Sequence, residues 1–255
     1  MHSVRKKSRT PRARILAALL AFVVLLIAAT AGAAFAYPSV ASTTCPGCYG
    51  LTETEEGVYA EDNLSDAQRS QVHQLVAQAR RLITGFYGTQ TSSPSLLICL
   101  TEACYQRIGG KKERGIAVLN RAVMLSPRGL NAVIASHEMS HVELHARLAS
   151  SAAVPQWFDE GLAVVVSDDT RYLAPAPAAD RCLIAPTGPL PVTLEEWLSA
   201  ASKDASTYAK SACQVSRWLH ANGGRTALLS LIERLNAGEQ FDSIVKLPAN
   251  YPVPS

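Results

Sequence analysis

The sequence predicts an α+β fold, a mostly helical domain with a small mixed sheet, preceded by one N-terminal transmembrane helix. Three observations lead to this prediction. Apolar residues recur at helical spacing in several long segments. Short apolar runs at 94–100, 115–119 and 122–125 have the length of buried strands, and all precede the segment His137-Glu138-Met139-Ser140-His141. A long uncharged run also lies near the N-terminus.

Residues 1–14 contain six Lys and Arg residues and no acid, which is typical of a cytoplasmic tail. Residues 15–36 are uncharged and apolar, and a helix of this length spans about 33 Å, enough to cross a bilayer. The length of the run favours an uncleaved, single-pass anchor. A cleaved signal peptide is the alternative, because Ala34 and Ala36 offer small residues at a cleavage site. Either way, we expect the rest of the chain on the periplasmic or extracellular side, anchored in the membrane or secreted.

The remainder divides into three parts. Residues 37–50, rich in Pro, Gly, Ser and Thr, are expected to form a juxtamembrane linker. Residues 51–245 are long enough to bury a single core, and residues 246–255, with three prolines, are expected to be a loose tail. The whole chain carries a net charge of +3, so removing the six basic residues of the N-terminal tail leaves −3. This balance does not indicate a nucleic-acid partner.

The elements before the His137 segment begin with a helix. Residues 65–87 follow a helical period, and Gly88 ends it. Residues 94–100 form an apolar run that predicts a buried strand. Residues 115–119 and 122–125 predict one or two further strands, because polar residues separate them.

The next helix, beginning after Asn131, carries the most informative motif of the chain. Residues four apart lie on one helical face, so His137 and His141 can point a ring nitrogen at the same metal ion. Glu138 is about 100° around the helix from His137, which places it beside the metal as a candidate general base. His145 lies about 12 Å from His137 along the helix, too far to share one ion. We expect His145 to pack or to orient another residue.

A third ligand is expected from Glu160, because catalytic zinc usually takes three protein ligands and leaves a fourth place open. Glu160 lies near the start of a second predicted helix, which follows Pro155 and continues through an apolar run. Two imidazoles and one carboxylate favour zinc over other divalent ions. A further carboxylate or carbonyl group should orient the histidines, and the sequence leaves Asp159 and Asp168 as candidates.

The C-terminal part is predicted to be helical after a long surface connection. Five prolines lie between residues 173 and 192. Thr193 and Glu196 form a capping box that begins a helix, and residues 206–221 and 226–236 predict two more.

Three segments together resemble a known family. The segment His137–His141, with Glu160 nineteen residues after His141, is similar to the gluzincin group of zinc metallopeptidases. The segment Pro155-x-Trp157-x-x-Glu160-Gly161-x-Ala163 resembles the corresponding part of bacterial peptidase-MA-like domains. A third segment, from Tyr208 to Leu229, resembles the pattern that closes those domains. A metzincin is excluded because Arg147 and Leu144 stand where that group has a third His and a Gly.

The resemblance implies a zincin-like fold over roughly residues 51–245 and assigns roles to the site residues. His137, His141 and Glu160 would be zinc ligands, and Glu138 the base and proton shuttle. Tyr208 would donate a hydrogen bond to the oxyanion of the tetrahedral intermediate. The alternative for Tyr208 is an ordinary half-buried tyrosine. The sequence also departs from some relatives, because Val164 stands where they have an Asp that orients a ligand.

Six cysteines in an exported chain indicate disulfides. Fifteen pairings are possible for six cysteines. The most plausible set joins Cys45 to Cys48, Cys99 to Cys104 and Cys182 to Cys213. A structural zinc site at Cys45 and Cys48 is less favoured, because no second pair of closely spaced cysteines follows.

These features predict an exported, membrane-anchored zinc metallopeptidase that hydrolyses peptide bonds of a peptide or protein substrate. Two alternatives stay open. One is a pseudo-peptidase or binding module that keeps the fold without turnover. The other is a zinc amide hydrolase acting on a cell-wall substrate, because fold alone does not fix the substrate. The oligomeric state and the cleavage specificity are not predicted.

Overall fold

The computed structural model describes residues 36–176 and 178–246, together with residues 19, 20, 22, 23, 25 and 32. Most of the segment 15–36, expected to be a transmembrane helix or signal peptide, therefore lies outside the described residues. The basic tail 1–14 and nearly all of the C-terminal tail 246–255 lie outside them as well. Within the described residues, no helix combines the length and the apolar character that a membrane span requires.

The described part of the chain contains one mixed sheet with the strand order β1-β2-β3-β5-β4. Its strands are β1 (Leu51–Glu55), β2 (Val58–Glu61), β3 (Ser95–Ile98), β4 (Gly115–Val118) and β5 (Ala122–Leu125). β2, β3 and β5 run parallel, and the outer strands β1 and β4 are antiparallel to their neighbours. The sequence predicted the last three strands and did not predict the β1–β2 hairpin.

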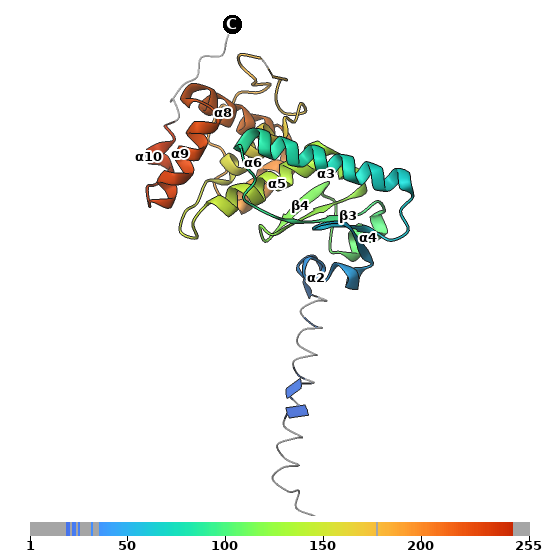
Figure 1. Cartoon of the computed structure of the whole chain (residues 1–255). Helices are drawn as coiled ribbons and strands as arrows, with labels where there is room; N and C mark the ends of the chain where they lie inside the picture. The colour runs from blue at the N-terminus through green and yellow to red at the C-terminus, as the bar shows by residue number, and fades with distance from the viewer. Residues whose placement is uncertain are drawn as a thin grey trace, which may run out of the picture.

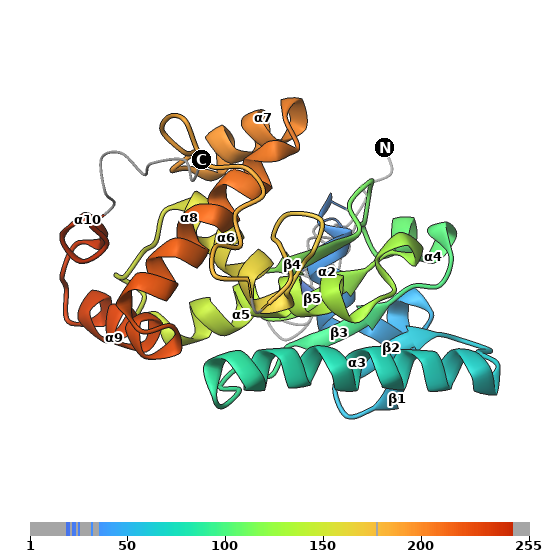
Figure 2. The same cartoon turned by 90° about the horizontal axis from the view of Figure 1, so that it is seen from above.

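Side chains alternate between the two faces of the sheet, as expected for strands covered on both sides. On one face, Leu96 and Val123 pack in a large core against the helices α3 (Asp66–Tyr87) and α5 (Ala132–Arg147). On the other face, Leu97 and Met124 pack against Tyr105 of α4 (Glu102–Arg107). Figure 1 shows α3 on the opposite side of the sheet from α2 (Pro38–Thr44), and Figure 2 shows α3 lying across the strands.

The predicted helix boundaries depend on local capping. Ser65 caps α3 and forms a capping box with Gln68, and Gly88 ends the helix with a positive φ of 86°. Asn131 caps α5 by accepting a hydrogen bond from the backbone of Ile134. Thr193 and Glu196 form the predicted capping box of α7 (Leu194–Lys203).

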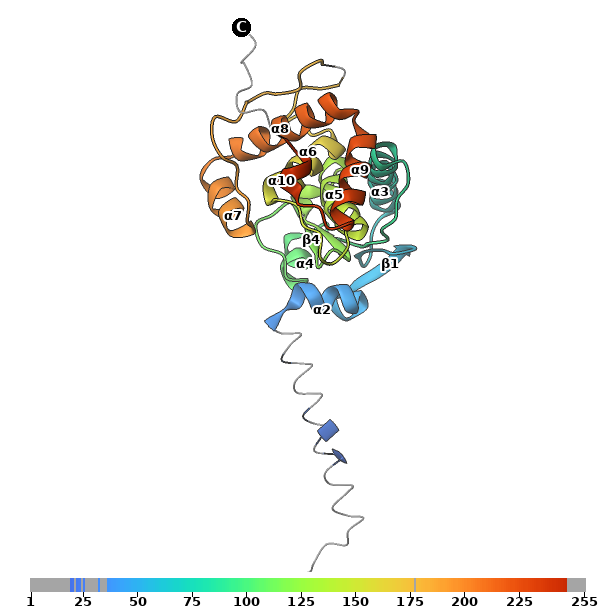
Figure 3. The ribbon, with the colours of Figure 1, turned by 90° about the vertical axis from the view of Figure 1, so that its left-hand side faces the viewer.

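The helical half of the molecule gathers around α5 and α6 (Gln156–Ser167), with α8 (Ser206–Asn222), α9 (Arg225–Asn236) and the short α10 (Phe241–Ile244) (Figure 3). An aromatic cluster joins α6, α8 and α10. The ring of Phe158 lies 5.6 Å from the ring of Trp218 and 5.1 Å from that of Phe241. The predicted α+β class, mostly helical with a small mixed sheet before the His137 helix, is therefore confirmed at this level.

The residues expected to form a linker, 37–50, contain α2 and the 3₁₀ turn η1 (Pro46–Tyr49). The buried hydroxyl of Ser42 donates to the carbonyl of Ile108, which ties α2 to the domain.

All three expected disulfides form, with Cα–Cα distances of 5.4 Å for Cys45–Cys48, 5.5 Å for Cys99–Cys104 and 4.6 Å for Cys182–Cys213. A second 3₁₀ turn, η2 (Pro127–Gly129), links β5 to α5.

The contact between α6 and α8 depends on Gly161. A Cβ added to Gly161 would lie 2.5 Å from the backbone oxygen of Ser211. We therefore expect Gly161→Ala to lower the free energy of unfolding by about 1–3 kcal/mol, as measured by urea denaturation. Gly85→Ala in α3 is the control, because a Cβ there meets nothing within 4 Å. That change should raise stability by up to about 1 kcal/mol, and equal effects of the two substitutions would contradict the packing argument.

Candidate metal centre

Helix α5 presents both histidines to the same point. His137 and His141 are one turn apart, and their ring centroids are separated by 5.0 Å. Each side chain is only 11% exposed. Because the helix is buried against the sheet and against α6, the two imidazoles point into a protected space rather than into solvent.

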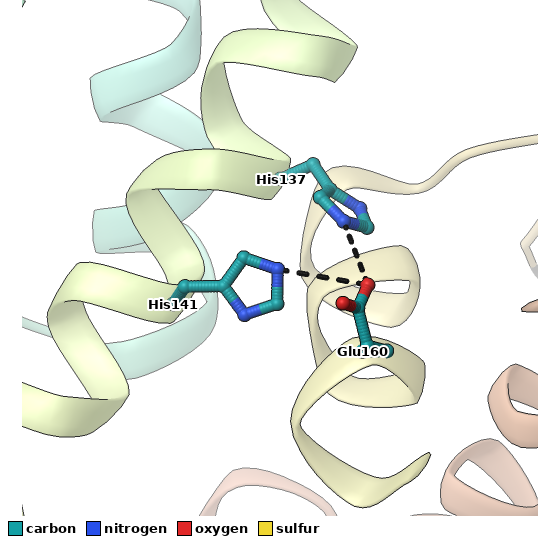
Figure 4. Close-up of side chains that lie close together, drawn as sticks. All are labelled: His137, His141 and Glu160. Atoms are coloured by element: carbon teal, nitrogen blue, oxygen red, sulfur yellow. Dashed lines mark ion pairs between the residues drawn. The ribbon is translucent and has the colours of Figure 1, made fainter. Parts of the chain in front are cut away.

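Helix α6 supplies the third predicted ligand. Glu160 Oε2 lies 3.4 Å from His137 Nε2 and 3.7 Å from His141 Nε2 (Figure 4). The three ligand atoms all lie within 4.8 Å of one another. The packing of α6 on α5 thus brings together two segments that are about twenty residues apart in the sequence.

This donor set fits a divalent metal ion. With metal–ligand bonds of about 2.0–2.2 Å, two ligand atoms of a tetrahedral zinc site are about 3.4 Å apart. The distances from Glu160 to the two histidines are close to this value. His137, His141 and Glu160 can therefore hold a metal ion, with a place left open for a further ligand.

Asp159 is the carboxylate that orients His141. Asp159 Oδ1 lies 2.7 Å from His141 Nδ1, which leaves Nε2 of that ring facing Glu160. Its second oxygen lies 2.8 Å from His145 Nε2, so His145 supports the same carboxylate. Asp168, the other candidate, lies at the end of α6 and pairs with Arg181. The structure thus distinguishes between two candidates that the sequence left open.

Charge around the ligands favours a cation. Burial by itself raises the pKa of Asp159, but His141 and His145 outweigh it and hold that pKa well below its usual range. Burial lowers the pKa of His141, but the carboxylates of Asp159 and Glu160 outweigh it and raise that pKa to about 10. Two carboxylates around two imidazoles therefore make a strongly cation-attracting site.

One residue that supports a predicted ligand was not predicted from the sequence. The side-chain amide of Gln156 donates to Glu160 Oε1 at 3.3 Å, which leaves Oε2 facing the two histidines. Gln156 begins α6 and lies one turn before Glu160. The only signal for this role in the sequence was a polar residue four positions before a predicted ligand on the same helix. Such a residue usually faces solvent.

Glu138 lies beside the ligands and next to the edge strand. A Cβ added to Gly115, the first residue of β4, would lie 2.9 Å from Glu138 Cγ. The backbone of Ala117 in the same strand lies close enough to the Glu138 carboxylate to lower its pKa. Burial raises the pKa of Glu138, although His137 and His141 partly oppose this. Glu138 and His137 line a cavity of about 270 Å³.

Tyr208 at the start of α8 lines the same cavity. Its ring centroid lies 6.4 Å from that of His137, and it stacks on Tyr172 at 5.0 Å. The indole of Trp197 packs edge-on against the ring of Tyr208, with the two ring centroids 4.8 Å apart. Burial and the charge of Glu160 raise the pKa of Tyr208, so the hydroxyl keeps its proton at neutral pH.

Replacing Asp159 tests its orienting role. We expect Asp159→Asn to weaken binding of a divalent metal by about 10- to 100-fold, because the amide no longer fixes His141 as a carboxylate does. A competition titration against a metal-binding dye would measure the change. Asp168→Asn is the matched control, because Asp168 pairs with Arg181 rather than with a ligand. Equal affinities of the two variants would contradict the assignment.

Comparisons with protein-family models, with characterised proteins and with solved structures found no match for this chain.

Proposed function

We propose that this chain is an exported, membrane-anchored zinc metallopeptidase of the gluzincin type, which hydrolyses peptide bonds. One observation carries the proposal: His137, His141 and Glu160 converge on one point with Glu138 beside them, at the edge of a sheet. The basic residues followed by an apolar run at the N-terminus support export and anchoring. The three disulfides fit an oxidising compartment.

A zinc ion held by His137, His141 and Glu160 would polarise the scissile carbonyl and acidify the attacking water. Glu138 accepts the proton of that water and later transfers it to the leaving amine. Its place against β4 supports this double role, because Gly115 of that strand lies directly against the Glu138 side chain at the cavity wall. Asp159 and Gln156 keep the ligand side chains oriented during the reaction.

Substrate binding is supported by the position of β4, which is an edge strand of the sheet within the described residues. An extended peptide can pair with the free edge of a strand through backbone hydrogen bonds. Tyr208 then donates a hydrogen bond from its hydroxyl group to the oxyanion that develops on the scissile carbonyl. The position of Tyr208 supports this role, because its ring lies 6.4 Å from that of His137 and lines the same cavity.

A catalytically inactive binding module is less well supported. Such a module would be favoured by a blocked cleft or by a Tyr208 remote from the metal site. Instead, Tyr208, His137 and Glu138 line one open cavity. An amide hydrolase acting on the cell wall would use the same groups, so the two activities differ only in the substrate accepted.

Metal removal tests the proposal. The purified full-length chain is expected to contain about one zinc ion per molecule and to cleave a mixed peptide library. Treatment with a chelator should abolish cleavage, and added zinc should restore it. Peptidoglycan fragments assayed in parallel would reveal the cell-wall alternative. A folded chain that binds no stoichiometric zinc would refute the metal site. Zinc binding without cleavage of any substrate would indicate a binding module.

A further inference from the structure

The loop that precedes β4 forms one wall of the catalytic cavity. Residues 112–115 line this cavity together with His137, Glu138 and Tyr208. Gly115 contacts Glu138 so closely that a side chain would not fit between them. Lys112 and Arg114 therefore lie three residues and one residue before Gly115, where the strand touches the proposed base.

Hydrogen bonds hold the backbone of this loop in place. The carbonyl of Arg114 accepts from both the backbone and the hydroxyl of Ser126, each at 2.9 Å. The carbonyl of Lys112 accepts from Arg128 Nη2 at 2.8 Å. Because these bonds use only main-chain atoms of Lys112 and Arg114, both charged heads stay available.

Some of the charged side chains that line the cavity have partners, and others do not. Glu113 is occupied, because its carboxylate accepts from the hydroxyl of Tyr105 and from the backbone of Lys111. Arg171, which also lines the cavity, is paired with the buried Asp169. Lys112 and Arg114 are exposed, and neither side chain forms an ion pair or hydrogen bond with the described residues.

This unpaired positive charge contrasts with the net negative charge of the chain after residue 14. After residue 14 the sequence carries a net charge of −3, from the total of +3 less the six basic residues before it. Acidic substrates would therefore be repelled by the exported part as a whole. Two free cations at the mouth of the cavity reverse this effect locally, because nearby charges dominate over those beyond about one Debye length.

We propose that Lys112 and Arg114 bind a carboxylate of the substrate, so that the cleft selects acidic peptides. This inference rests on the proposed peptidase function. A guanidinium group binds a carboxylate through two parallel hydrogen bonds, and an ammonium group adds a compact charge. The carboxylate belongs either to an Asp or Glu side chain near the scissile bond or to the C-terminus of the peptide. Both sources present the same chemistry to the loop.

The experiment uses the zinc-loaded full-length chain, purified in detergent, and pairs of quenched fluorescent peptides. In one set, Glu is exchanged for Gln at each position around the scissile bond. In the other, a free C-terminus is exchanged for an amide. We expect kcat/KM to be about tenfold higher for the carboxylate form in at least one set, and this preference should shrink as NaCl is raised. The set that shows the preference identifies the source of the carboxylate.

The variant Lys112→Gln/Arg114→Gln tests the residues, with melting temperature and zinc content as checks of folding. Its ratio of kcat/KM between carboxylate and neutral peptides should fall close to one. Arg69→Gln, an exposed cation of α3 that does not line the cavity, should keep the wild-type ratio. Cleavage without any preference, or a preference that the double variant retains, would overturn this inference and leave the peptidase proposal standing. Absence of cleavage of every peptide would overturn both.

Discussion

Replacing Glu138 with Gln is expected to lower kcat/KM for peptide hydrolysis by about 10²- to 10⁴-fold, which is the usual contribution of a positioned general base. Gln is close in size to Glu and keeps a hydrogen-bonding group toward β4, but it cannot accept the proton of the attacking water. The three ligand atoms come from other residues, so zinc content should stay at the wild-type level. Steady-state assays and metal analysis of the same preparation would measure both quantities.

The matched control for this change is Glu233→Gln. Glu233 is an exposed carboxylate of α9 that does not line the cavity, so its removal should leave both activity and zinc content unchanged. Equal hydrolysis by Glu138→Gln and the wild-type chain would remove Glu138 from the mechanism. Loss of zinc in Glu138→Gln would instead show that the carboxylate is needed to build the site.

The central part of the candidate metal site could be predicted from the sequence because its geometry is local. His137, Glu138 and His141 lie within two turns of one helix, so their relative directions follow from helix geometry alone. The prediction of Glu160 required more than helix geometry, because its position depends on how α6 packs on α5. The apolar run after Glu160 indicated that packing, and the resemblance to gluzincins indicated the residue.

The orientation of the ligands could not be predicted, because it depends on contacts that the spacing does not determine. Asp159 and Asp168 are both acidic residues near Glu160, and nothing in the sequence separates them. In the structure Asp168 ends α6 in a left-handed conformation, with φ 52°, and pairs with Arg181 from the long connection. Asp159 lies within the first turn of α6, where it meets the ring of His141.

In the fold as well, features set by local sequence could be predicted and features that depend on tertiary contacts could not. The start of α7 follows from a capping box, which is visible in four consecutive residues, and the end of α3 follows from Gly88. The strand β1 was missed because most of its residues are exposed and polar, so it lacks the alternation that predicts a strand. The helix α2 lies in a segment whose Pro, Gly, Ser and Thr content is typical of linkers. Its contact with Ile108 is a tertiary effect that composition does not reveal.

Replacing Tyr208 with Phe is expected to lower kcat by about 10²- to 10³-fold, which is the usual cost of losing one donor to the oxyanion. The ring itself remains, so the stacking on Tyr172 and the edge-on contact with Trp197 are kept. Substrate affinity and zinc content should change little, because the hydroxyl proton is used chiefly when charge develops on the carbonyl oxygen. Separate values of kcat and KM, obtained with the zinc-loaded chain, would distinguish this effect from weaker binding.

Tyr172→Phe is the informative comparison, because Tyr172 lines the same cavity and stacks on Tyr208. Its hydroxyl has no assigned part in the reaction, so its removal should cost clearly less than that of Tyr208. If Tyr208→Phe retained the wild-type kcat, Tyr208 would be a packing residue, and the oxyanion would depend on other donors.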